Sequence, residues 1–247
     1  MLDKIDSSPN NLLDKAEYKD ELKQLNKQLV DYQKKMNAQG KYSILIIFQG
    51  MDASGKDGAT RRVLEGVNPS GIHVKSFKKP TDEEFAHDFL WRVHQHSPAK
   101  GMIQVFNRSH YEDILVPSVL GYIPKEVVEE RYEMINKFEE LLEHNNTKVL
   151  KFFLHVSKEE QLERLQERID NPEKHYKHND GDWETREHWD NYMKVYQSIF
   201  EKCNTIPWNI IPSDKNWYKT YTITKKIIEA FESMDLEWPE LETEKFN

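Results

Sequence analysis

The chain has 247 residues, 37% of them hydrophobic, and a formal net charge of −8. Its longest unbroken apolar run, Ile44–Phe48, is far shorter than the roughly 20 residues that cross a bilayer, and no basic segment followed by an apolar stretch opens the chain. The single cysteine, Cys203, excludes an internal disulfide and a cysteine-rich zinc site. We therefore expect a reduced, cytoplasmic protein with no membrane partner, and the acidic balance argues against nucleic-acid binding.

The first 40 residues are predicted to form a helical extension. Apolar side chains recur there at alternating steps of four and three, which places them on one helix face. They are Tyr18, Leu22, Leu25, Leu29, Tyr32 and Met36. Two alternatives follow from this stripe: the helix packs on its own domain, or it forms a short coiled-coil seam with a second subunit.

Strand and helix patterns alternate through the rest of the chain. The predicted strands are runs of apolar residues at Tyr42–Phe48, Ile72–Phe77, Gly101–Phe106, Thr147–Val156 and Ile206–Ile211. Helical patterns lie at about 58–64, Asp82–His94, Lys125–His144, Ser157–Ile169, Asp182–Lys202 and Asn216–Met234. This alternation predicts an α/β fold of three layers, in which helices cover both faces of a parallel sheet of about five strands.

Residues 50–58 form the most informative segment, because G-x-x-x-x-G-K there follows a buried strand and precedes a helix. That is the context of a P-loop, whose backbone N–H groups cradle phosphate oxygens at a helix N-terminus. We expect Lys56 to reach the phosphate that is transferred. The other loop residues that we expect to line the substrate are Gly50, Met51, Ala53, Ser54, Gly55, Asp57 and Gly58.

Two acids make this loop unusual. Asp57 stands where ordinary P-loop NTPases carry Ser or Thr for magnesium, and its alternative role is to favour the helix dipole from the first turn. Asp52 lies among the expected phosphates, where a carboxylate repels them unless a cation intervenes. We therefore interpret Asp52 as a magnesium ligand or as the group that orients the attacking phosphate, with a loop-capping acid as the alternative.

A second polar loop, residues 107–113, follows the strand Gly101–Phe106. Asn107 holds the place of the usual Walker B acid, so Glu112 or Asp113 could supply the missing carboxylate. Arg108 is suited to bidentate phosphate binding, with a surface ion pair as the alternative. We interpret His110 as a packing or hydrogen-bonding histidine.

Residues from about 168 to 182 are predicted to form a lid. Pro172 ends a helical pattern there, and cations recur at Arg168, Lys174 and Lys177. Such a segment can close over reacting phosphates, exclude water and add positive charge, whereas the alternative is a solvated charged loop. Further candidate phosphate contacts lie after the second strand and on the P-loop helix, at Lys78, Lys79, Arg61 and Arg62.

Together these motifs resemble the polyphosphate kinase 2 family. The resemblance rests on Gly50–Gly58, Asn107–Asp113 and Asn171–Lys174, with shorter matches at Gly66–Gly71 and Lys215–Tyr218, and it covers about residues 40–235. It implies a P-loop kinase-like fold with a helical lid, in one domain over residues 1–247. It also implies Mg²⁺, with Mn²⁺ as an alternative, and a homo-oligomer, either a dimer or a tetramer.

The resemblance further implies a reversible transfer of a phosphoryl group between inorganic polyphosphate and a nucleotide. In the family, the residues that match Asp52, Lys56, Arg108 and Arg168 are functional. Many members carry Asp where this chain has Asn107, and the version found here looks like the branch that accepts nucleoside mono- and diphosphates such as AMP and ADP or GMP and GDP. Glu112 is our candidate for a branch-specific residue that helps to place an extra metal ion.

The predicted mechanism is an in-line transfer with no covalent enzyme intermediate. Polyphosphate follows a basic track to Lys56, Asp52 with magnesium orients the nucleotide's terminal phosphate, and Arg108 and Arg168 neutralise the moving charge. Two rivals stay open. One is an ATP-dependent nucleotide kinase of the thymidylate-kinase type, against which Asp57 counts, and the other is a non-enzymatic P-loop protein that binds nucleotide as an assembly switch.

Overall fold

The computed structural model describes residues 5–9, 15–243 and 245. Five strands, all parallel, form one sheet in the order β2-β3-β1-β4-β5. They are β1 (Ser43–Gln49), β2 (Ile72–Ser76), β3 (Ile103–Asn107), β4 (Thr147–His155) and β5 (Trp208–Pro212). The predicted α/β class with a five-stranded parallel sheet is therefore confirmed, and β1 lies at its centre.

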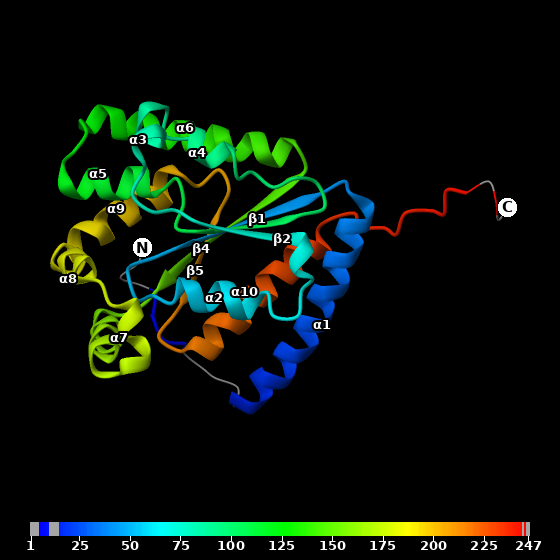
Figure 1. Cartoon of the computed structure of the whole chain (residues 1–247), viewed down its shortest axis with the longest axis horizontal. Coiled ribbons are helices and arrows are strands. Elements are labelled where there is room, and N and C mark those ends of the chain that lie inside the picture. Colours follow the sequence, from blue (N-terminus) through cyan, green and yellow to red (C-terminus); the bar gives the residue numbers. More distant parts are fainter. Residues whose placement is uncertain (1–4, 10–14, 244, 246–247) are drawn as a thin grey trace.

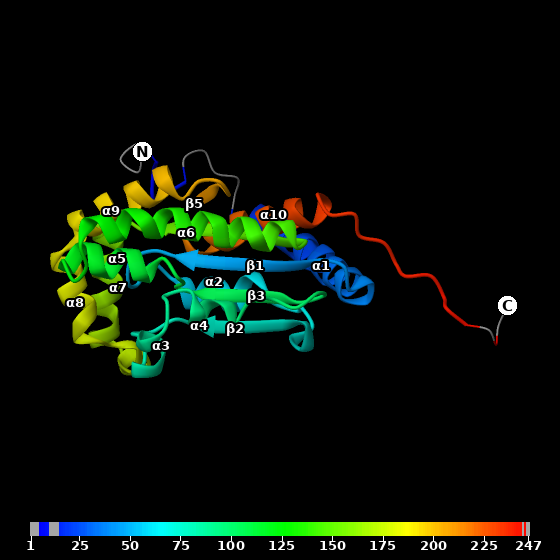
Figure 2. The same cartoon turned by 90° about the horizontal axis from the view of Figure 1, so that it is seen from above.

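Helices cover both faces of this sheet, as Figures 1 and 2 show. One face carries α1 (Lys15–Gln39), α2 (Lys56–Val63) and α10 (Asn216–Glu232), and the other carries α5 (Glu112–Leu120), α6 (Lys125–His144) and α9 (Trp189–Lys202). Strand β1 supplies both cores: Ile44 and Ile46 pack with α2 and α10, whereas Leu45 and Ile47 pack with α6. This two-sided burial explains why the strand is continuously apolar.

The apolar stripe of α1 packs against the chain's own α10. Leu29 and Met36 are fully buried in the core on that face, and the ring of Tyr32 stacks on Phe231 at a centroid distance of 5.5 Å. The helix thus packs on its own domain, which was the first of the two alternatives. Leu22, Leu25 and Tyr32 of the stripe are only partly buried, and the oligomeric state stays a prediction.

Two predicted helices are interrupted. The pattern at Asp82–His94 forms α3 (Asp82–Ala86) and α4 (Trp91–His94), because the backbone is extended at His87 and the Asp88 carboxylate accepts a hydrogen bond from Leu90 N–H at 2.9 Å. The pattern at Asp182–Lys202 forms α8 (Asp180–Glu187) and α9, which meet at His188. An Asn179 N-cap starts α8 two residues earlier than predicted.

Helix α5 follows the second loop and was not predicted, because Pro117 lies inside it. Proline has no backbone N–H, so the carbonyl four residues earlier has no hydrogen-bond donor within the helix. That carbonyl belongs to Asp113, and the side chain of Arg131 donates to it at 2.5 Å. A side chain from α6 therefore satisfies the acceptor that proline leaves open.

The carboxyl edge of the sheet carries the remaining short elements. Helix α7 (Lys158–Asp170) leads into the 3-10 helix η3 (Pro172–Lys177) and then into α8. Figure 2 shows α7 and α8 beyond the arrowheads of the strands. The predicted lid segment thus lies at the edge where ligands bind in open α/β folds.

Candidate active site

The phosphate loop leaves the carboxyl end of β1 in a backbone conformation that needs glycine. Gly50 has φ 147° and Gly55 has φ 95°, and a Cβ added at Gly50 would lie 2.8 Å from the carbonyl oxygen of Leu154. Ala53 adopts φ 60°, in the left-handed region that non-glycine residues rarely enter. The glycines of the motif are therefore required by the shape of the loop itself.

The carbonyl oxygens of residues 50 to 55 all accept hydrogen bonds from side chains. The donors are Lys56 Nζ for residues 50 and 51 (2.7 and 3.0 Å), Gln161 Nε2 for residue 52 (3.0 Å), Arg164 Nη1 for residue 53 (3.0 Å) and Lys219 Nζ for residues 54 and 55 (3.2 and 3.4 Å). These bonds fix the loop through its acceptors, while the N–H groups of such a loop form an anion-binding concavity.

Sequence reasoning missed three of these four donors. Gln161 and Arg164 lie three residues apart on α7, so they share one helix face. That spacing was the only available signal, and it did not indicate which neighbour the face meets. Lys219 lies on α10, more than 160 residues after the loop, and no motif marks it.

Lys56 begins α2 and is 8% exposed. Burial and the nearby Arg108 guanidinium lower the pKa of its ammonium group, whereas the carboxylates of Asp52 and Glu112 oppose that shift. Beside it, Asn107 Nδ2 donates to Asp57 Oδ1 at 2.5 Å. Asn107 thus joins the end of β3 to the first turn of α2, and it contributes an amide where a Walker B acid usually stands.

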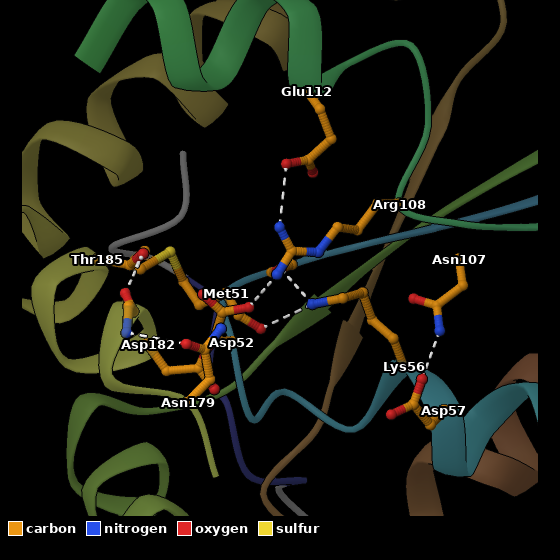
Figure 3. Close-up of polar contacts among 12 residues, drawn as sticks. Met51, Asp52, Lys56, Asp57, Asn107, Arg108, Glu112, Asn179, Asp182 and Thr185 are labelled. Atoms are coloured by element: carbon orange, nitrogen blue, oxygen red, sulfur yellow. Dashed lines mark hydrogen bonds and ion pairs between the residues drawn. The ribbon is translucent and has the colours of Figure 1, made fainter. Parts of the chain in front are cut away.

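Arg108 forms the centre of a carboxylate cluster, shown in Figure 3. Its guanidinium forms an ion pair with Asp52 and lies 3.4 Å from Glu112 Oε2. These carboxylates raise the pKa of Arg108 further, with Glu112 as the larger cause. The residue has φ 59°, a strained conformation of the kind that collects at functional sites.

The two acids that could replace the Walker B residue occupy different environments. Glu112 lies near Lys56 and accepts a hydrogen bond from Gln49 Nε2 at 3.1 Å. Asp113 turns away from the site and forms an ion pair with Arg92 at 2.9 Å. Burial raises the pKa of Asp113 although Arg92 opposes the shift. Of the two, Glu112 is the carboxylate in reach of the phosphate loop.

The lid segment is tied together by ion pairs. Arg168 Nη1 lies 2.5 Å from Asp182 Oδ2 and 3.0 Å from the carbonyl oxygen of Lys177, and Lys174 pairs with Glu167. Burial raises the pKa of the Asp182 carboxyl, and Asp52 adds to that shift while Arg168 opposes it. Arg168 therefore bridges the end of α7 to the start of α8.

A cleft of about 1200 Å³ opens between the phosphate loop, the residues after β2 and the lid. Most predicted site residues line it: Asp52, Ala53, Gly55, Lys56, Asp57, Gly58, Arg61, Arg62, Lys78, Lys79, Asn107, Arg108, Arg168, Lys174 and Lys177. Among the described residues, eleven cationic side chains and five carboxylates line the cleft, a formal charge of +6 within a chain of −8. A polyanion is the ligand that this imbalance favours.

Four predicted residues do not line the cleft. The side chain of Met51 packs in the apolar core with α5 and α9, and Ser54 is fully buried. Gly50 contributes its carbonyl to Lys56, and Glu112 contacts Arg108 rather than the cleft itself. Met51 and Ser54 thus belong to the support of the loop.

Neither a ready-made metal cage nor a membrane span is found in the part of the chain that the structure describes. No three His, Cys, Asp or Glu side chains converge there as ligands for a metal ion. No helix over residues 15–243 has both the length and the apolar character needed to cross a bilayer.

A phosphate loop on the central strand, a cationic cleft and a helical lid define a P-loop kinase. Comparison with known proteins gives the family. The model of the family described as polyphosphate kinase 2 matches residues 12–239. An AMP/ADP-polyphosphate phosphotransferase from Meiothermus ruber is 47% identical over 221 residues, which cover 89% of this chain and 83% of the relative. An ADP-polyphosphate phosphotransferase from Rhodopseudomonas palustris is 39% identical over 240 residues, covering 92% and 83%.

The same relationship is seen in three dimensions. The crystal structure of polyphosphate kinase 2 from Arthrobacter aurescens matches with a TM-score of 0.95 and 38% identity, over 98% of this chain and 89% of that one. The chain belongs to the polyphosphate kinase 2 family, and the family resemblance of its motifs is confirmed. It is accordingly an enzyme of the kinase class, which removes the non-enzymatic switch as an explanation of the loop.

Proposed function

We propose that this enzyme transfers a phosphoryl group from inorganic polyphosphate to AMP and ADP, or to GMP and GDP, and that the reaction is reversible. The observation that carries the proposal is the cleft charge of +6 beside a phosphate loop, because a chain of linked phosphates needs many cations in a row. The names of the relatives from Meiothermus ruber and Rhodopseudomonas palustris, which specify AMP and ADP in one and ADP in the other, support the same substrates.

The proposed roles follow from position and charge. Lys56 and Arg108 neutralise the moving phosphoryl group, and Arg168 adds charge from the lid when residues 168–182 close over the cleft. Asp52 orients the attacking phosphate. Lys78 and Lys79, with Arg61 and Arg62 on α2, guide the phosphate chain along the cleft. In-line phosphoryl transfer is mainly positioning and electrostatic stabilisation, so no covalent intermediate is required.

The donor set near the loop fits Mg²⁺, or Mn²⁺ in its place. Mg²⁺ takes oxygen ligands and is usually held by one or two carboxylates together with substrate phosphates, so it needs no cage made only of protein. Asp52 and Glu112, which both contact Arg108, are the carboxylates that would hold it. When bound, the ion neutralises phosphate charge, while Arg108 keeps the two carboxylates next to Lys56.

The decisive experiment incubates the purified protein with AMP or ADP, long-chain polyphosphate and Mg²⁺, and separates the nucleotides by chromatography. The proposal expects ADP and ATP from AMP, and ATP from ADP, only when polyphosphate is present. A parallel reaction with AMP as acceptor, ATP as phosphate donor and no polyphosphate tests the ATP-dependent rival, because transfer from ATP to AMP yields two ADP. Failure to form ATP from either acceptor, or equal transfer from ATP alone, would overturn the proposal.

We also propose that the chain acts in the cytoplasm as one catalytic domain with residues 1–40 as a helical extension, and as a dimer or tetramer. The presence of a single cysteine, Cys203, fits a reducing compartment, and the family resemblance supports the oligomer. Light scattering on the eluting protein measures the subunit number, and a monomer at micromolar concentration that turns over fully would exclude the oligomer as a requirement.

A further inference from the structure

Lys219 places a buried amino group directly under the phosphate loop. It is 1% exposed, although lysine is almost never fully buried. Its Nζ lies 3.2 Å from Ser54 O, 3.4 Å from Gly55 O and 2.9 Å from Asn216 Oδ1. An ammonium group has three N–H donors and these are three acceptors, whereas a neutral amine has only two. The geometry therefore matches the charged form.

The loop is shaped around this amino group. At Gly55 the backbone has φ +95°, and a Cβ added there would lie 2.1 Å from Lys219 Nζ. Any side chain at this position would displace Nζ from the two loop carbonyls. The glycine before Lys56 thus serves two purposes, the turn itself and the space for the amino group of Lys219.

We propose that Lys219 is a positioning residue of phosphoryl transfer: its ammonium form holds the carbonyls of Ser54 and Gly55, and binding of a phosphate chain in the cleft is coupled to its protonation. Lys219 acts on the loop and does not touch the reacting atoms. The proposal rests on the proposed function, because polyphosphate is the ligand whose charge drives the coupling.

The charges that face Lys219 make the coupling effective near neutral pH. Burial lowers the pKa of its amino group to about 7, and Arg164 on α7 and Arg62 and Lys56 on α2 lower it in the same direction, while Glu160 on α7 opposes them. All of these groups line the cleft. A polyanion bound there compensates the cations and favours the ammonium, so binding takes up protons above pH 7.

Linkage fixes the sign of the effect. If ligand binding raises the proton affinity of Lys219, then loss of the proton weakens binding. The affinity for a phosphate chain should therefore fall as pH rises above 7, by at most about tenfold per pH unit for one proton. Below pH 7 the lysine is charged in both states, and this contribution to the slope disappears.

The test is calorimetry with tripolyphosphate alone, which binds without nucleotide and without turnover. Proton uptake at pH 7.5 is obtained from two buffers of different ionisation enthalpy, and affinities are measured from pH 6 to 9. Wild type is compared with Lys219→Met, and with Lys226→Met as the matched control on the exposed side of α10. The ionisation of tripolyphosphate itself is common to all and cancels in the differences.

We expect Lys219→Met to take up fewer protons than wild type when it binds tripolyphosphate. Its affinity should also decrease less steeply between pH 7 and 9, whereas Lys226→Met should behave as wild type. Lys219→Arg, which keeps a permanent charge, provides a second variant should the methionine not fold, and it should bind with a similarly flattened profile. Proton uptake and pH profiles equal to wild type in both Lys219 variants would overturn the role of Lys219 alone. Absence of tripolyphosphate binding to wild type would overturn the proposed function together with it.

Discussion

Two clusters of charged side chains share the second loop, and they differ in how their charges are satisfied. His110 and Tyr111 belong to a buried cluster in which Glu139 pairs with Lys151 at 2.7 Å. Arg108 belongs to the cleft cluster with Asp52 and Glu112. Neighbouring residues of one loop thus face a closed cluster on one side and a ligand site on the other.

The ion pair of the buried cluster is satisfied without a ligand. Lys151 Nζ has three acceptors, Glu139 Oε2, Tyr111 OH at 3.0 Å and the carbonyl of Cys203 at 2.9 Å, and Glu139 also accepts from Tyr111 at 2.8 Å. Burial alone would raise the pKa of Glu139, but Lys151 and His110 hold it below its ordinary value. In the cleft, by contrast, cations outnumber carboxylates. Paired charges therefore characterise the buried cluster that supports the fold, whereas unpaired cationic charges characterise the ligand site.

The largest expected effect is a loss of stability when the ion pair of the buried cluster is broken. Lys151→Met leaves Glu139 without its cation, and removal of one partner of a buried ion pair costs about 3–5 kcal/mol of unfolding free energy. Urea denaturation followed by circular dichroism measures it. The double variant Lys151→Met/Glu139→Leu removes both charges and should recover most of the loss, whereas a loss below 1 kcal/mol in the single variant would show that the pair is not a support.

The next effect separates activity from stability in the cleft. Lys56→Ala and Asp52→Asn should each lower kcat by about a hundredfold, corresponding to about 3 kcal/mol of transition-state stabilisation. Both variants should nevertheless stay folded, because Lys56 and Asp52 lie outside the three apolar core clusters of the sheet. Lys226→Ala, outside the cleft, is the control. An Asp52→Asn enzyme with wild-type turnover would contradict the role given to that carboxylate.

A substitution at Glu112 tests whether the second loop also determines which nucleotide, AMP or ADP, accepts the phosphoryl group. Glu112→Gln keeps the size of the side chain but removes the charge beside Arg108 and Gln49, and we expect the ratio of the AMP rate to the ADP rate to fall by about tenfold, or about 1.4 kcal/mol. Parallel initial-rate assays with both acceptors measure the ratio. Glu163→Gln on the exposed face of α7 serves as control, and an equal loss for AMP and ADP would assign Glu112 to general catalysis.

The smallest effect concerns the outer cations. Lys78 is exposed and lies after β2, so Lys78→Ala should raise the KM for polyphosphate by only about threefold, within the roughly 1 kcal/mol of a solvated charge contact, and leave kcat unchanged. Titration of polyphosphate at saturating ADP measures both constants, with Lys23→Ala on α1 as control. A hundredfold loss of kcat would place Lys78 among the groups that contact the transferred phosphate.

The sequence was sufficient where a local pattern determines the outcome. Strand β1 and the glycine loop were predicted because apolar runs and glycine spacing reflect backbone requirements within a few residues. Helix α5 was missed because Pro117 is a helix breaker unless a distant donor, here Arg131, satisfies the carbonyl of Asp113. The expectation for His110 as a hydrogen-bonding residue agrees with its contact to Glu139 at 3.3 Å.

The site was predicted only as far as its motifs reach. The residues of the two loops and the lid were named, whereas Gln161, Arg164 and Lys219 were not, because their role is to bind carbonyls of a loop that lies far away in the sequence. Such contacts depend on tertiary packing and leave no periodic pattern. Met51 lies inside the motif, but its side chain packs in the core, so contact with substrate stays a prediction for its backbone alone.

The formal charge of the cleft has a consequence for the encounter with substrate. If the cleft carries +6 in a chain of −8, the remainder of the molecule carries −14, so the protein is electrically polarised. A long anion that approaches from behind is repelled, and one that approaches the mouth is drawn inward, which steers association and weakens as ionic strength rises. The acidic exterior thus orients the incoming chain before any residue of the cleft touches it.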